Sequence, residues 1–204
     1  MELGHMAELT EGMLAKVRSI LESRDLSQLS QQHDQIVVLR EAVLSYLQHV
    51  GRAELSDAEA DEHALLVAAT GEIENMSAAV SYELIPLAQT LKEANTTPSK
   101  ETTDLLERLF QTIQASAHSA LRALVEHDEP AAQTVVANRD AILKLTAEFH
   151  RQQAMRLAGN EPDRLLRLRV QLEILDRLRR LYSVAEHMAI SVLPRSVLVG
   201  ELSA

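Results

Sequence analysis

The sequence has no cysteine and no tryptophan, and only two phenylalanines and three tyrosines among its 204 residues. The lack of cysteine excludes disulfides, thiolate metal sites and cysteine nucleophiles. Because aromatics are so few, a core must be built from Leu, Ile, Val, Ala and Met, which is typical of helices packed on helices. Glycine (6) and proline (5) are also scarce. We therefore expect long elements with few connections.

Basic residues are outnumbered by acidic ones, and long apolar runs are absent from the sequence. The 30 acidic residues outnumber the 20 basic ones, for a net charge of −10, which argues against nucleic acid as a partner. No run approaches the roughly 18 apolar residues that cross a bilayer, and the start of the chain does not resemble a signal peptide. These features favour a cytoplasmic location. Tethering at the inner face of the cytoplasmic membrane, through a segment preceding this sequence, stays open.

Apolar residues recur at helical spacing in six segments. They predict helices over about 7–23, 26–50, 56–93, 99–127, 130–159 and 162–193. Ser56 and Glu59 have capping-box spacing at the start of the third helix, and Pro86 predicts a local adjustment near its end.

The apolar stripes of three of these helices name the residues expected in the core. In the third helix the stripe is Leu65, Leu66, Ala69, Ile73, Met76, Val80, Leu84 and Leu87. In the fourth it is Leu105, Leu109, Ile113, Ala117, Leu121 and Leu124. In the sixth it is Leu165, Leu168, Leu172, Leu175, Leu178, Leu181, Ala185, Met188 and Val192.

A linker, Asn-Thr-Thr-Pro-Ser at 95–99, divides the six helices into two groups of three. It predicts two domains, residues 7–94 and 99–194. Glu22 and Glu126, at matching helix ends, are 104 residues apart, and Glu74 and Arg179 are 105 apart. This nearly constant offset favours an internal duplication; chance similarity among leucine-rich helices is the alternative. We predict an all-α fold of two tandem three-helix bundles.

Three stretches carry a family resemblance. The first is 39–47 (Leu-Arg-Glu-Ala-Val-Leu-Ser-Tyr-Leu) followed by 55–59 (Leu-Ser-Asp-Ala-Glu), the second 72–76 (Glu-Ile-Glu-Asn-Met), and the third 175–183 (Leu-Asp-Arg-Leu-Arg-Arg-Leu-Tyr-Ser). In this order they resemble helices 2, 3 and 6 of the PhoU family, whose members are tandem three-helix bundles. The third stretch is more similar to the PhoU-like cytosolic domain of bacterial sodium/phosphate cotransporter-family proteins. The resemblance spans residues 9–194.

The resemblance implies a non-enzymatic regulatory or interaction domain linked to phosphate transport. The expected partner is a protein, either a phosphate transporter or the chain's own membrane domain, and a homodimer is an open alternative. No G-x-S-x-G elbow, Walker loop, His-Glu-x-x-His or glycine-rich phosphate cradle is present. We therefore predict that the chain is not an enzyme; an enzyme with an unrecognised site is the remaining alternative.

Some PhoU proteins bind metal clusters through carboxylates four residues apart, which share one helix face. The resemblance places Glu72 and Glu74 at the acidic positions of the first repeat, but Arg177 and Arg179 at those of the second. The closing aspartate positions hold Ala78 and Ser183. We therefore expect neither a metal nor another cofactor. The alternative function is a metal-binding PhoU-type protein with a degenerate carboxylate site at Glu72 and Glu74.

Two other groups of residues merit interpretation. Arg177, Arg179 and Arg180 belong to a cluster of six arginines in the sixth helix. They form a candidate contact for an anion, an anionic lipid or an acidic partner, although a solvated face paired with acids is the favoured interpretation. Glu59 and His63 are four apart and could bind an ion weakly, but an exposed helical pair is the favoured interpretation.

Overall fold

A computed structural model describes residues 2–23, 27–84, 86, 99–157 and 164–194. Its elements are the α-helices α1 (Glu2–Ser23), α2 (Ser27–Val50), α3 (Asp57–Ala78), α5 (Lys100–Glu126), α6 (Glu129–Ala137), α7 (Arg139–Leu157) and α8 (Arg164–Val192), and the π-helix η1 (Ala79–Leu84). Every regular element in these ranges is helical, so the predicted all-α class is confirmed. Residues 87–98 and 158–163, where we placed helix ends and most of the linker, lie outside the described residues. The domain bounds 7–94 and 99–194 remain predictions.

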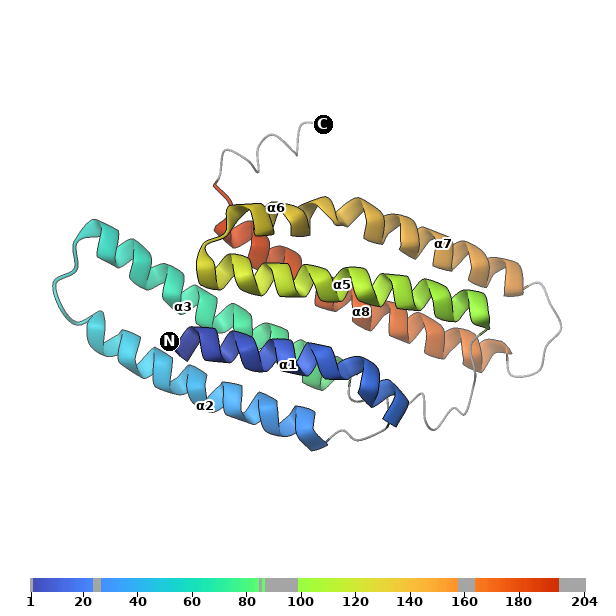
Figure 1. Cartoon of the computed structure of the whole chain (residues 1–204), viewed down its shortest axis with the longest axis horizontal. Coiled ribbons are helices and arrows are strands. Elements are labelled where there is room, and N and C mark those ends of the chain that lie inside the picture. The colour runs from blue at the N-terminus through green and yellow to red at the C-terminus, as the bar shows by residue number, and fades with distance from the viewer. Residues whose placement is uncertain (1, 24–26, 85, 87–98, 158–163, 195–204) are drawn as a thin grey trace.

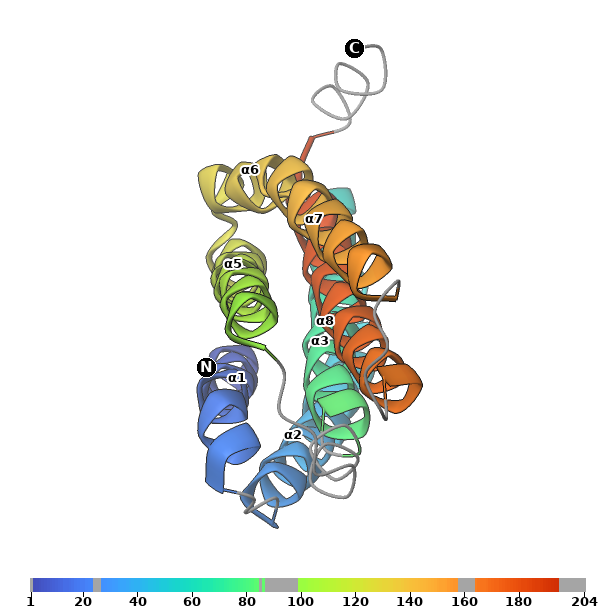
Figure 2. The same cartoon turned by 90° about the vertical axis from the view of Figure 1, so that its right-hand side faces the viewer.

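The helices form two three-helix bundles that lie against each other (Figure 1). α1, α2 and α3 with η1 make the first, and α5, α6 followed by α7, and α8 make the second. Figure 2, turned by 90°, shows α1 beside α5 and α3 beside α8, with α2 at one edge and α6 and α7 at the other. One continuous apolar core runs through both bundles, from Met13 and Ile73 to Ile113 and Met188. The two bundles are therefore packed as a single unit.

The helix ends follow from local sequence. Ser56 and Glu59 form the predicted capping box, with Glu59 Oε2 accepting from the Ser56 amide at 2.8 Å. Ser99 and Asp128 are simple N-caps of α5 and α6, each side chain accepting from a backbone amide three residues ahead. None of the described helices combines the length and the apolar character that crossing a membrane requires.

The expected fifth helix is broken at Asn138, between α6 and α7. The Asn138 amide hydrogen is shared between the carbonyls of Thr134 (3.3 Å) and Val135 (3.2 Å). Its side chain donates to Ser116 Oγ at 3.0 Å. The hydroxyl of Tyr182 on α8 donates to the Val135 carbonyl at 3.0 Å. Tyr182 thus bonds a backbone carbonyl at the break, and Ser116 holds the Asn138 side chain beside it.

The predicted adjustment near Pro86 takes the form of η1. Proline has no amide hydrogen and its ring crowds the preceding turn, and the wider π-helical register occupies residues 79–84, just ahead of it. This register leaves Ser81 buried and Tyr82 66% exposed.

The stripe predictions were confirmed in α5 and partly wrong elsewhere. All six predicted α5 residues are buried. In the predicted third helix, Ala69, Ile73 and Met76 of α3 and Val80 of η1 are buried, but Leu65 is 49% exposed. The side chain of Leu84, and Leu87 altogether, fall outside the description. In α8, Leu165 is 72% exposed. Both errors have the same cause. The apolar stripe continues along the helix past the point where neighbouring helices cover it.

Candidate functional site

The structure directs Glu72 and Glu74 toward different neighbours. Glu72 Oε1 lies 3.0 Å from Nδ1 of His187 on α8, so this pair joins the two bundles. Glu74 Oε2 lies 2.6 Å from Nε of Arg40 on α2, within the first bundle. Residues two apart lie on nearly opposite sides of a helix. The two carboxylates are therefore not brought together to share a cation.

A groove between α3 and α8, here called the inter-bundle groove, collects the positions that the resemblance associates with metal. Glu72, Ala78, Ser183 and His187 line it, together with Asn75, Ala79, Tyr82 and Val184. Its donors are one carboxylate already paired with an imidazole, one amide and two hydroxyls. The described residues contain no cluster of three histidine, aspartate or glutamate side chains placed to hold a metal. These residues do not fit a carboxylate-held metal cluster.

Glu59 and His63 are each engaged in local structure. Hydrogen bonds from the Ser56 side chain and the Ser56 amide lower the pKa of Glu59. His63 Nε2 lies 2.8 Å from the carbonyl oxygen of Leu47, which ties α3 to the end of α2. Because a carbonyl only accepts, this ring nitrogen is the donor.

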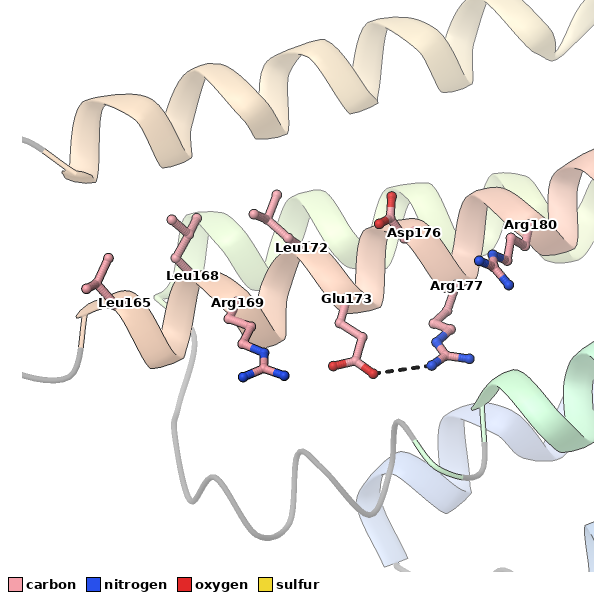
Figure 3. Close-up of a pocket in the computed structure, with 8 residues that line it drawn as sticks. All are labelled: Leu165, Leu168, Arg169, Leu172, Glu173, Asp176, Arg177 and Arg180. Atoms are coloured by element: carbon pink, nitrogen blue, oxygen red, sulfur yellow. Dashed lines mark hydrogen bonds and ion pairs between the residues drawn. The ribbon is translucent and has the colours of Figure 1, made fainter.

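The three candidate arginines lie on an outer surface of α8 that is hollowed by two grooves. The first, the leucine groove, is drawn in Figure 3 and is lined by Leu165, Leu168, Arg169, Leu172, Glu173, Asp176, Arg177 and Arg180. The second, the α7–α8 groove, is lined by Arg139, Ile142 and Leu143 of α7 and by Asp176, Arg179, Arg180, Tyr182, Ser183 and Glu186 of α8. Asp176 and Arg180 border both, so the two grooves adjoin along α8.

The charges on this surface are partly compensated by each other. Arg177 Nη2 lies 3.3 Å from Glu173 Oε1, one helical turn earlier. Arg139 Nε lies 2.7 Å from Glu186 Oε1. Arg179 and Arg180 are exposed. The sequence interpretation of paired charges therefore holds for Arg177, whereas Arg179 makes no ion pair with any described residue.

Sequence reasoning missed His187, Arg40 and the exposed Leu165. His187 and Arg40 acquire their roles only when helices distant in the chain pack together, and no spacing reveals that. Leu165 was assigned to the core, although its place at the very start of α8 was a signal that neighbours would be few.

The sequence matches no protein-family model. No protein of curated function matches it either. The structure is similar to a crystal structure of PhoU from Pseudomonas aeruginosa, with a TM-score of 0.78 and 17% sequence identity, over 94% of this chain and 91% of that one. At this level of identity the similarity establishes a PhoU-like fold.

Proposed function

We propose that this chain is a regulatory protein of phosphate homeostasis that acts by binding another protein. The observation that carries the proposal is the PhoU-like arrangement of its helices over nearly the full length of both chains. Fold alone does not fix function. The supporting detail is the grooved surface of α8, which coincides with the 175–183 stretch that resembles the cotransporter-type domain.

In its finer form the proposal places the chain in the cytoplasm, bound to a phosphate transporter or to a membrane domain of its own. Arg177, Arg179 and Arg180 are the proposed contact residues. We propose no catalytic role, because the polar groups singled out from the sequence have structural partners: Glu59 caps α3, Glu74 pairs with Arg40, and His63 ties α3 to α2.

Deleting the coding region in the native organism, then measuring radiolabelled phosphate uptake at high and low external phosphate, tests this proposal. We expect uptake to lose its response to external phosphate, and the wild-type gene to restore it. The variant R177E/R179E/R180E is expected not to restore it, whereas R52E, on the exposed loop after α2, should. Unchanged phosphate regulation in the deletion strain would overturn the proposal.

We also propose that the protein works without a bound metal. The support is the donor set of the inter-bundle groove, where Glu72 already faces His187 and the remaining lining positions offer no second carboxylate. Elemental analysis of protein purified without chelators tests this. Stoichiometric iron, zinc or manganese that is lost in E72Q/E74Q would support the metal-binding alternative instead.

A further inference from the structure

The first half of α8 carries an apolar row beside a charged row. Figure 3 shows Leu165, Leu168 and Leu172 pointing to one side of the helix, and Arg169, Glu173 and Arg177 to the other. Leu165 is 72% exposed, and the two leucines that follow it are half-buried. Their spacing, i, i+3 and i+7, is the one by which one helix packs along another. A single exposed leucine needs no explanation, but a row of three lining a groove is suited to an apolar partner.

The charge around this row favours an acidic partner. Residues 164–180 contain six arginines and two acidic residues, a net charge of +4 in a chain whose total is −10. The rest of the chain therefore carries −14. At physiological ionic strength charges act over about 8 Å, so an acidic segment is attracted locally to α8 and repelled by most of the remaining surface.

The carboxylates within the groove distinguish a protein helix from a simple anion. Glu173 and Asp176 lie among the arginines of the leucine groove, and Glu173 pairs with Arg177 at 3.3 Å. A phosphate ion would face these carboxylates directly and would leave the leucine row unused, and an anionic lipid surface would bring its headgroups onto Glu173 and Asp176. A helix with a narrow apolar seam and acidic flanks can cover the leucines and reach past the carboxylates.

We propose that the two adjoining grooves, together called the α8 groove, bind an amphipathic, acidic helix of the partner protein. Its apolar seam lies on Leu165, Leu168 and Leu172, and its carboxylates meet Arg169 and Arg179. The groove extends from Leu165 to Glu186, or about 30 Å at 1.5 Å per residue, which accommodates a helix of roughly 20 residues. This inference rests on the proposed function, because it specifies the partner segment that the α8 surface recognises.

A designed peptide tests the chemistry directly on the full chain. The probe is three copies of the heptad LEALEAE, with a fluorophore at its end, and the matched control replaces every Glu with Lys. Fluorescence anisotropy should show that the acidic peptide binds, that added salt weakens binding, and that the lysine peptide binds at least about tenfold more weakly. Equal binding of the two peptides, or no binding of the acidic one, would overturn the inference.

Surface variants locate the site. L165Q, R169E and R179E change exposed side chains, so the circular dichroism spectrum should not change. Each should weaken acidic-peptide binding about fivefold or more, and R169E/R179E should bind the lysine peptide better than wild type does. R52E matches the charge change of each single arginine variant and should alter affinity less than about twofold. An effect of R52E as large as that of R169E would show that total charge, rather than this groove, governs binding.

A photo-crosslinking residue at position 165, with a second variant at exposed Tyr46 on α2, examines the partner in cells. Mass spectrometry should identify, at position 165, a peptide with helically spaced apolar residues and net negative charge. A lipid adduct, a second copy of this chain, or a partner captured only from position 46 would overturn the inference. If the deletion strain loses phosphate regulation as expected, any of those results would overturn this inference alone. The proposed function would remain.

Discussion

Tyr182 illustrates how single polar residues act in this apolar core. It is only 6% exposed, and its hydroxyl lies 3.0 Å from the Val135 carbonyl and 3.1 Å from Glu186 Oε1. Burial, and then the neighbouring charge of Glu186, raise the pKa of Tyr182 well above its usual range. The phenol therefore stays neutral and keeps its hydrogen, which is within reach of both the Val135 carbonyl at the break between α6 and α7 and the Glu186 carboxylate.

Replacing Tyr182 by Phe should destabilise the protein by about 1 kcal/mol. The change removes one partner of the Val135 carbonyl, which retains the Asn138 amide, so the loss should stay below that of an orphaned buried group. Urea denaturation followed by circular dichroism measures it. Y46F is the matched control, because Tyr46 is 69% exposed, and it should be neutral. An equal effect of both variants would show that the Tyr182 hydroxyl contributes nothing specific.

At the scale of elements, α3 has two unlike halves. Its first half, residues 57–68, has no buried residue, whereas Ile73 and Met76 in its second half are fully buried. The first half is held instead by the capping box at Ser56 and by the contact of His63 with Leu47. Polar contacts and helix propensity therefore support one half of α3, and core packing supports the other.

Replacing Ser56 by Ala should cost about 1 kcal/mol at neutral pH, because the cap is lost. The pKa of Glu59 lies below its ordinary value of 4.5 in the folded protein. Its carboxylate therefore contributes stability above pH 4.5, and this contribution is lost as the pH falls through the lowered pKa. The difference between wild type and S56A in urea titrations should shrink in acid. A difference that is constant from pH 7 to below pH 3 would contradict this account. S45A, an exposed change within α2, is the control.

The two halves of α3 should also respond differently to cavity formation. I73A should destabilise the protein by about 2–4 kcal/mol, because it empties space in a fully buried position. L65A should change stability by less than about 0.5 kcal/mol, since Leu65 is half exposed. Thermal unfolding of both variants compares them directly. A large loss of stability in L65A would show that Leu65 belongs to the core, as the sequence stripe predicted.

These elements show what sequence could predict. The predicted stripe of α5 was correct throughout. This helix packs against neighbours along its whole length, so every residue at the helical spacing of the stripe is buried. The capping box was correct because its partners are three residues apart. The break at Asn138 was not foreseen, since it depends on Ser116 and Tyr182, which come from other helices.

At the scale of the whole molecule, two histidine–glutamate pairs join the bundles. His118 of α5 lies 2.9 Å from Glu11 of α1, and His187 of α8 lies 3.0 Å from Glu72 of α3. Both histidines are mostly exposed, so these pairs contribute little to stability and mainly help to align the two bundles. The shared apolar core is the main support of the interface. None of the four residues could be assigned a partner from sequence, because each pairing depends on how two separate bundles align.

A double-mutant cycle on E72Q and H187N should give a coupling energy of roughly 0.2–1 kcal/mol at low salt. The coupling should decrease in about 1 M salt, where exposed charges are screened. Urea unfolding of the four proteins measures it. The pairing of E11Q with H187N, which joins residues of the two separate pairs, is the control and should be additive within error. Equal coupling in both cycles would show that the effect is general rather than local.

The break at Asn138 has a consequence for the shape of the α7–α8 groove. Asn138 directly precedes Arg139, which with Leu143 forms the α7 side of the α7–α8 groove. α6 packs closely on α8, whereas α7 contacts α8 at few places, so the direction of α7 after the break fixes where the α7 side of the groove lies. Substitutions at the Asn138–Ser116 contact should therefore change the shape of the α7–α8 groove without changing any side chain that lines it. A comparison of surface residues alone would not detect such a change.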